Sequence, residues 1–96
     1  MRIDYNNIKY IEGMRDYIRI HLDGQKPIMS LMGIKKLMEH LPTEKFMQVH
    51  RSFIVNLNKI TTIERNRIIF DKDEYIPVSE QYKDSFQNYL DNNFLK

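Results

Sequence analysis

The chain has 96 residues, of which 42% are hydrophobic and 29% charged, with a net charge of +2 and no cysteine. This length allows one domain with a modest core, and the composition is that of a folded globular protein. The lack of cysteine excludes disulfides and thiolate chemistry. No run approaches the roughly 20 apolar residues of a transmembrane helix. The N-terminus has no apolar signal segment, so we expect a cytoplasmic protein without membrane contact.

The charges are unevenly distributed along the chain. Up to residue 70 there are twelve Lys and Arg against seven Asp and Glu, and from residue 71 onward there are three against six. Such an uneven field can turn the basic part of a protein toward a polyanion. Similar asymmetry also arises by chance, so it is supporting evidence only.

The first third of the sequence predicts three short strands. Ile8–Glu12 is the first, and Tyr17–Leu22 follows with the period-two alternation of a half-buried strand. Asp23-Gly24 predicts a turn, after which Gln25–Met29 returns as a third strand. Pro27 lacks an amide donor, which favours an edge position for this strand.

A helix is predicted next. Ser30 can cap a helix that runs to about Leu41, where Pro42 ends it. One apolar stripe with i, i+3, i+4, i+7 spacing is formed by Ile34, Leu37, Met38 and Leu41. This stripe predicts a core-facing helix, while Lys35 and Lys36 lie on its solvated side.

The central stretch Phe46–Asn56 is a strand-forming apolar run interrupted by His50, Arg51 and Ser52. A half-buried strand alternates apolar and polar residues, so three adjacent polar residues indicate a bend that turns them out of the fold. Arginine suits two-point contact with a guanine edge or a phosphate, and His and Ser add weaker contacts. Two alternatives are a sheet rim that merely faces water and an arginine that bridges a carboxylate.

The C-terminal part predicts a small sheet followed by a helix. Residues 61–64 and 67–70 form strands around an Arg65-Asn66 turn, residues 71–74 form a second turn, and Tyr75–Val78 is a third strand. Ser79 caps the last helix, with Glu80 in its first turn. The apolar face of this helix contains Tyr82, Phe86, Tyr89 and Leu90. Leu57–Ile60 connects this part to the central stretch, as one helical turn in one interpretation.

Catalysis finds little support in the sequence. The three histidines lack the spacing of metal ligands, the three glycines are scattered, and no serine has a G-x-S-x-G setting. We therefore expect neither an enzyme nor a cofactor or metal site. Two binding functions remain, namely a DNA-binding domain and a protein–protein interaction module without DNA binding. The second would use tyrosines on the sheet faces, which are Tyr5, Tyr10, Tyr17 and Tyr75.

Four segments in order resemble one family. They are Ile8–Glu12, then Asp16-Tyr17-Ile18, then F-M-Q-V-H-R-S-F-I-V-N with the following L-N-K-I and I-E-R, and Ile76–Ser79 with Tyr82 and Phe86. Together they resemble the LytTR family of bacterial DNA-binding domains, usually found at the C-terminus of response regulators. The resemblance covers nearly the whole chain. It implies a mainly β, α+β domain over residues 1–96, with an elongated β-β-β fold of small antiparallel sheets.

The resemblance also implies where DNA is bound, in loops at one edge of the fold. Its first loop corresponds to Met14 and Arg15, and its central motif to His50, Arg51 and Ser52. The third region follows Pro77-Val78 and contains Ser79, Gln81 and Lys83. Some family members have an arginine near this point, where this chain has Ser79-Glu80, so a weaker contact is expected there.

The implied role is the output domain of a two-component transcriptional regulator. Its partners would be promoter DNA with repeated half-sites, on which two domains pair, and a receiver domain in the full-length chain. The family pattern usually has a further strand before the one at Ile8, so we expect a piece of a longer regulator whose first strand is missing.

Overall fold

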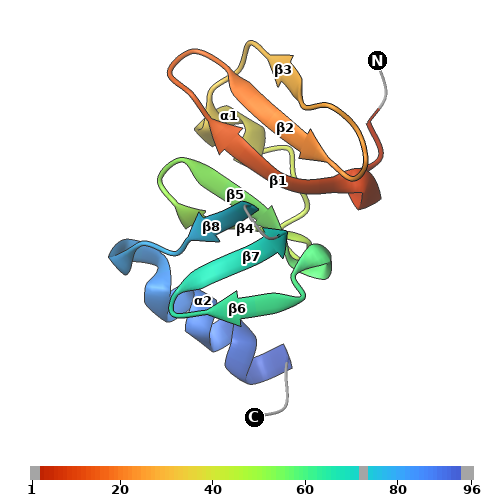
Figure 1. The fold of residues 1–96 in the computed structure, drawn as a ribbon. Helices are drawn as coiled ribbons and strands as arrows, with labels where there is room; N and C mark the ends of the chain where they lie inside the picture. Colours follow the sequence, from red (N-terminus) through yellow and green to blue (C-terminus); the bar gives the residue numbers. More distant parts are fainter. Residues whose placement is uncertain (1–2, 72–73, 94–96) are drawn as a thin grey trace.

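The described part of the chain folds into two antiparallel sheets and two helices (Figure 1). In the computed structural model, residues 3–71 and 74–93 are described. The strands in these ranges are β1 (Ile8–Gly13), β2 (Ile18–Leu22), β3 (Ile28–Ser30), β4 (Phe46–His50), β5 (Phe53–Asn56), β6 (Thr62–Glu64), β7 (Arg67–Asp71) and β8 (Glu74–Pro77). The helices are α1 (Ile34–Met38) and α2 (Glu80–Asn93), and single 3-10 turns cover Tyr5–Asn7 and Leu57–Lys59.

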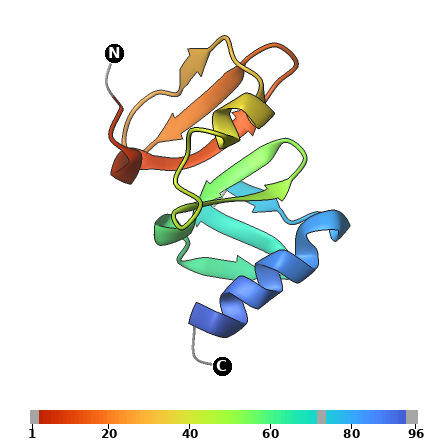
Figure 2. The same ribbon diagram turned by 180° about the vertical axis from the view of Figure 1, so that it is seen from behind.

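The two sheets lie one below the other in Figures 1 and 2. The five-stranded sheet has the order β3-β2-β1-β5-β4, and the three-stranded sheet has the order β6-β7-β8. All neighbouring strands are antiparallel. The Cα atoms extend over 40 × 26 × 23 Å. The elongated, mainly β architecture of small antiparallel sheets with two helices is therefore confirmed. Neither helix of the described chain is long and apolar enough to cross a membrane.

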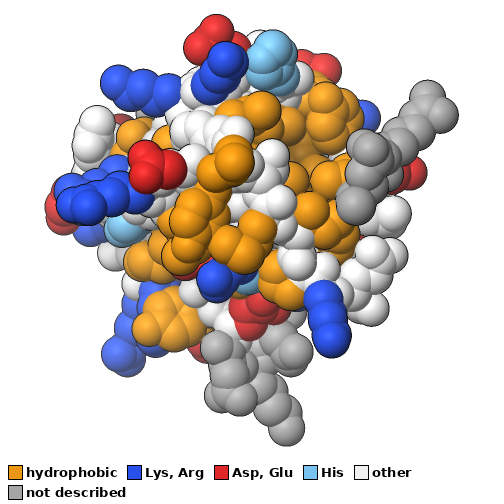
Figure 3. Space-filling model, turned by 90° about the horizontal axis from the view of Figure 1, so that it is seen from above, with side chains coloured by type: hydrophobic (Ala, Val, Ile, Leu, Met, Phe, Trp, Pro, Cys, Tyr) orange, Lys and Arg blue, Asp and Glu red, His pale blue; other side chains and the backbone are white. Residues whose placement is uncertain are grey.

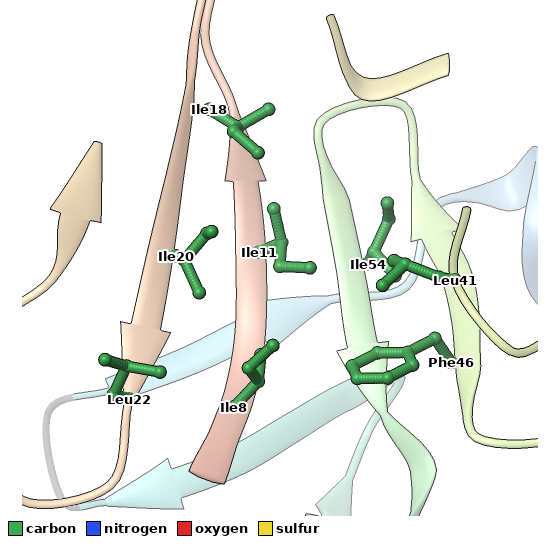
Figure 4. Packing of buried hydrophobic residues seen from close by; sticks show 8 residues of the cluster. All are labelled: Ile8, Ile11, Ile18, Ile20, Leu22, Leu41, Phe46 and Ile54. Carbon is green, nitrogen blue, oxygen red and sulfur yellow. The ribbon is translucent and has the colours of Figure 1, made fainter. Parts of the chain in front are cut away.

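One face of the five-stranded sheet packs against α1, and Figure 4 shows the buried side chains of this core. Its side chains come from β1, β2, β4, β5 and the segment after α1, and they are Ile8, Ile11, Ile18, Ile20, Leu22, Leu41, Phe46 and Ile54. A shift of register between Ile8 and Tyr10 places Ile8 on the same face as Ile11, three residues later. The helix contributes Ile34, Leu37 and Met38, as its apolar stripe predicts.

The opposite face packs against the three-stranded sheet and α2. Tyr10, Val49 and Val55 of the first sheet meet Ile68 and Ile76 of the second. Further buried contacts come from Leu57, Val78 and Phe86. The central strands β1 and β5 thus place buried side chains on both faces of the sheet.

A polar cluster joins the two sheets at the side of this second core. The Tyr10 hydroxyl donates to Glu74 at 2.8 Å, and Lys9 Nζ lies 2.6 Å from the same carboxylate. Burial raises the pKa of Glu74, but the hydrogen bonds from Lys9 and Tyr10 outweigh that effect and hold it below its ordinary value. Burial and the bond to Glu74 raise the pKa of Tyr10. Glu74 is therefore held ionised between two donors.

Most of the predicted turns are confirmed. Arg65 and Asn66 have φ angles of 46° and 65°, which is the left-handed geometry of a tight hairpin turn. The interrupted stretch is a hairpin, with β4 and β5 paired on either side of the turn. Leu57–Lys59 forms a 3-10 turn. The turn predicted over residues 71–74 lies partly outside the described residues, since residues 72–73 are not described.

The predicted start and length of the first helix are wrong. Ser30 does not cap it, because Ser30 belongs to β3 and pairs with Ile18 of β2. The helix begins after Gly33, whose backbone is extended at φ −80° and ψ 154°, and it ends at Met38. Leu41 reaches the core from beyond the helix. Pairing with β2 therefore overrides the local capping preference of Ser30.

The third strand also differs from its prediction. It covers Ile28–Ser30 instead of Gln25–Met29, because the turn after β2 extends through Pro27. Gly24 has a φ of +64°, which only glycine adopts at low cost. As predicted, β3 is an edge strand. Met29 on this strand and Leu31 immediately after it are both exposed, and Leu31 is 86% exposed. Hydrophobic side chains gather over this end of the molecule in the view from above (Figure 3).

Asn56 is a buried polar residue at the end of β5, only 3% exposed. Its Nδ2 donates to the carbonyls of Ile8 at 2.8 Å and Tyr5 at 3.2 Å, and its Oδ1 accepts from the amide of Asn58 at 3.0 Å. The side chain thus holds the N-terminal 3-10 turn against β5. Its role is structural.

We expect Asn56→Ala to lower the free energy of unfolding by about 1–3 kcal/mol, because the Ile8 carbonyl is left buried without its donor. Urea unfolding measures this directly. Asn58→Ala is the matched control, since Asn58 is exposed and uses only its backbone amide in this contact. Equal stability of wild type and Asn56→Ala would contradict the assigned role.

Glu74→Gln should make the free energy of unfolding depend less on pH in the acid range. A carboxyl with a lowered folded-state pKa adds stability above its unfolded pKa, and this is lost as pH falls through the folded pKa. The variant should be less stable than wild type at neutral pH, with the gap closing in acid. The measurement is urea unfolding of both proteins at a series of pH values from neutral into acid. The control is Glu39→Gln, because Glu39 is exposed and its side chain has no ion pair in residues 3–71 and 74–93.

Candidate nucleic-acid interface

The turn between β4 and β5 consists of Arg51 and Ser52. His50 and Phe53 pair across the hairpin, and the register shifts between Gln48 and His50. Val49 is fully buried just before the turn, and Phe53 is half-buried just after it. The apolar residues on either side therefore anchor the hairpin and leave the polar residues at its tip.

The turn is held by its own hydrogen bonds. Gln48 Nε2 donates to the carbonyls of His50 and Arg51 at 3.2 and 3.3 Å. The amide of Ser52 donates to Nδ1 of His50 at 3.0 Å. Because Nδ1 accepts this bond, the neutral ring carries its proton on Nε2, which leaves that atom as a donor. His50 also packs against Phe53, with ring centroids 5.3 Å apart.

Arg51 is exposed at the tip of this turn. Its guanidinium has no ion pair or hydrogen bond to any residue in the described part of the chain. The alternative of an arginine that bridges a carboxylate in the sheet is therefore not found there. An unpaired guanidinium keeps its donors available for a phosphate or a base edge.

The loop between β1 and β2 lies directly beside this turn. The amide of Gly13 donates to the carbonyl of Ser52 at 2.7 Å, which extends the pairing of β1 with β5. A Cβ at Gly13 would lie 3.0 Å from Cδ1 of Ile34, so the loop packs closely on α1. Met14 is half-buried and Arg15 is exposed. The two sequence motifs therefore form adjoining parts of one surface.

The start of α2 joins the same surface from the other side. The amide of Ser79 donates to the carbonyl of Val49 at 3.0 Å, next to His50. Ser79 immediately precedes α2, and its carbonyl accepts from the amide of Tyr82 at 2.9 Å. Gln81 is exposed, whereas Lys83 Nζ lies 3.0 Å from the carboxylate of Glu80. Lys83 is thus partly neutralised, and Ser79 and Gln81 are the better placed members of this group.

The three predicted contact regions lie along one edge of the molecule. In Figure 1 the β1–β2 loop, the β4–β5 turn and the start of α2 follow one another down the left side, and Figure 2 shows the same order from behind. Lys and Arg side chains are frequent on the left margin in the view from above (Figure 3). The structure therefore gathers Met14, Arg15, His50, Arg51, Ser52, Ser79 and Gln81 on this edge.

Two residues that shape the edge are missing from the sequence prediction. Gln48 fixes the turn, and Gly13 allows the loop to approach both Ser52 and Ile34. In the sequence, Gly13 follows the first predicted strand and begins the loop that contains Met14 and Arg15. Gln48 is a polar residue inside an apolar run, two positions before the turn, and this is the one signal that could have found it.

The fold and this edge define a class of protein. It is a small β domain whose turns, and not a recognition helix, present polar and basic side chains. The LytTr DNA-binding domain model matches residues 1–91, and the chain belongs to this family.

Relatives and a solved structure agree with this assignment. The chain is 33% identical over 91 residues to the transcriptional regulatory protein YpdB of Escherichia coli O6:H1 and likewise to those of Escherichia coli K12 and Shigella flexneri. The alignment covers 88% of this chain and 37% of each relative, so the chain spans about a third of their length. A LytTr DNA-binding domain from Bacillus cereus superposes with a TM-score of 0.80 at 24% identity, covering 94% of this chain and 86% of that one.

We expect Gln48→Leu to weaken DNA binding severalfold while changing thermal stability little. Leucine has a similar volume but cannot donate to the two turn carbonyls, so the turn loses its preorganisation. Fluorescence anisotropy and a thermal melt on the same variant test this. Gln87→Leu is the matched control, because Gln87 lies on α2 and bonds to Asp91. Unchanged affinity in Gln48→Leu would show that these bonds do not prepare the turn for DNA.

Proposed function

We propose that this domain binds duplex DNA sequence-specifically through the turns of this edge, as the output domain of a bacterial two-component transcriptional regulator. One observation carries the proposal. Two backbone hydrogen bonds, from Gly13 to Ser52 and from Ser79 to Val49, align three turns, and the arginines of two of them are exposed. Family membership supports the same function.

The helices are poorly suited to read a groove. α1 has five residues, and its apolar stripe is packed into the first core. α2 packs Phe86 into the second core, and its exposed residues include Glu80, Asp84 and Asp91. An acidic helix face is repelled by the phosphates that line a groove. This leaves the turns as the reading elements.

The turn residues divide into base and phosphate contacts by their chemistry. Arg51 has the planar fork that pairs with N7 and O6 of guanine in the major groove. His50 offers its Nε2 proton to a base or phosphate acceptor, and the Ser52 hydroxyl lies beside it. Arg15 supplies a second positive charge from the neighbouring loop. Ser79 and Gln81 provide neutral donors at the start of α2.

The proposed context is a longer cytoplasmic regulator with a receiver domain. The relatives are named transcriptional regulatory proteins, and they extend well beyond the part that this chain matches. We further propose that two domains pair on repeated half-sites. The longest dimension of 40 Å is close to one turn of B-DNA, about 34 Å. Half-sites about one helical turn apart would place two copies on the same side of the duplex.

A second candidate function is protein binding at β3. Leu31 is 86% exposed and Met29 52% exposed, and with Tyr17 and Ser30 they line a shallow hollow beside the edge strand. Of the tyrosines considered for such a role, Tyr10 is buried, whereas Tyr5 and Tyr75 are 40% and 51% exposed. A protein-binding module without DNA affinity would bind its partner with little dependence on salt, which separates the two functions.

Arg51→Ala should weaken binding to the selected DNA site by about 1–3 kcal/mol and relax discrimination at one base pair. Because Arg51 is exposed and unpaired within the described residues, the free energy of unfolding of the Arg51→Ala variant should differ from that of wild type by less than about 0.5 kcal/mol. The site is first selected from a random duplex library with the wild-type protein. Anisotropy titration and urea unfolding are then measured on the same preparation.

Lys26→Ala is the matched control for this experiment. Lys26 is exposed in the turn between β2 and β3, which lies at the opposite side of the molecule from the β4–β5 turn (Figure 1). Its affinity should equal that of wild type. Loss of stability in Arg51→Ala with intact affinity would remove Arg51 from the interface, and failure to enrich any duplex would refute specific DNA binding.

A further inference from the structure

We infer that the β6–β7 turn is a fourth DNA-contacting element, in which Arg65 and Arg67 bind the phosphate backbone. This inference rests on the proposed DNA binding and extends it to a turn to which the family resemblance assigned no DNA contact. The chemical group recognised is a phosphodiester of the same duplex that the other turns contact.

The position of the turn follows from a third backbone hydrogen bond. The amide of Val78 donates to the carbonyl of Asn66 at 2.8 Å, and the next residue, Ser79, donates to Val49. The β6–β7 turn is therefore attached to the start of α2 as directly as the start of α2 is attached to the β4–β5 turn. In Figure 1 it continues the row of turns down the left side.

The charge of the turn suits a phosphate. Arg65 and Arg67 are both exposed and, together with Glu64, line a hollow at the tip of the hairpin. Among the side chains of residues 3–70 and 74–93, no carboxylate lies within ion-pair distance of either guanidinium. Two positive charges against one negative charge leave the hollow attractive to an anion.

The geometry fixes the backbone of the turn and orients the side chain of Arg67. The left-handed φ angles of Arg65 and Asn66 close the hairpin tightly. The guanidinium of Arg67 lies 5.0 Å from the centroid of the Tyr75 ring, on the neighbouring strand β8. Such a cation–π contact orients the guanidinium without consuming its hydrogen-bond donors. The side chain therefore remains able to bind an oxyanion.

This position predicts a contact of a particular kind. The turn lies beyond the start of α2, at the end of the row and away from the central Arg51. A contact at the periphery of a protein–DNA interface meets the backbone of the duplex, which fixes position and carries no sequence information. The β6–β7 turn should thus add affinity equally to selected and unrelated duplexes.

Arg65→Asn is the variant that tests this inference, because asparagine tolerates the left-handed conformation of this position and removes the charge. Binding is measured by anisotropy over a range of salt concentrations, with the selected duplex and with a scrambled one. We expect severalfold weaker binding to both duplexes. The slope of log affinity against log salt should fall in magnitude by about 0.9, the value for one lost phosphate contact.

Three further variants serve as comparisons for Arg65→Asn. Glu64→Gln removes the opposing charge in the hollow and should tighten binding to both duplexes at low salt. Lys26→Asn removes an exposed positive charge at the opposite side of the molecule and should leave affinity and slope unchanged. Arg65→Gly, which also accepts a positive φ, confirms that any loss comes from the missing guanidinium. A thermal melt of each variant verifies the fold.

The outcomes separate this inference from the proposed function. If wild type binds the selected duplex and Arg65→Asn matches it in affinity and slope, the fourth contact is refuted and the proposed function stands. If Arg65→Asn loses discrimination but keeps its salt slope, the turn reads bases and the phosphate assignment is wrong. If wild type binds neither duplex, the proposed function fails first.

Discussion

The burial of both faces of β5 is the constraint on which the rest of the structure depends. Ile54 faces the core under α1, and Val55 faces the core shared with the second sheet, and both are fully buried. A charged side chain in place of Ile54 or Val55 would be buried without a partner, which costs free energy. Arg51 lies just before the strand, at the tip of the hairpin, where the chain leaves the core.

The same packing makes the edge rigid. The two sheets pack against each other through the buried side chains of Tyr10, Val55, Ile68 and Ile76. The ion pair of Lys9 with Glu74 connects them at one side. With the sheets held in this relation, the amide of Ser79 meets the carbonyl of Val49. Turns that are fixed in the free protein lose little conformational entropy on binding. This favours turns as reading elements, although isolated loops are usually mobile.

The electrostatic design is local and does not depend on net charge. The total of +2 is small, yet Arg15 and Arg51 lie exposed on one edge, and neither side chain has an ion pair in the described part of the chain. Two acidic residues lie on the same edge: Asp16 is exposed in the β1–β2 loop, and Glu80 begins α2, where it pairs with Lys83. Glu74 is held by Lys9 and Tyr10, and the exposed carboxylates of α2 lie on a helix that packs against β4. A basic edge on a nearly neutral domain orients the protein on a polyanion without strong nonspecific attraction.

The sequence by itself determined the local elements and the residues at their ends. Period-two alternation located β2, the Arg65-Asn66 pair located a hairpin turn, and the three polar residues inside Phe46–Asn56 located the β4–β5 turn. Each of these depends on neighbours within a few positions, which a sequence displays directly. The resemblance of four motifs to one family supplied the architecture and the loops to examine.

Only the tertiary structure decided which turns lie together and where strand pairing overrides a local preference for another structure. Ser30 has the chemistry of a helix cap, but it pairs with Ile18 in the sheet, where the ladder satisfies its backbone. The bonds that align the edge join Gly13 to Ser52, Val49 to Ser79 and Asn66 to Val78. They connect residues far apart in the chain, and no local pattern encodes them. They form only where the packing of two cores has already brought the backbones within hydrogen-bonding distance.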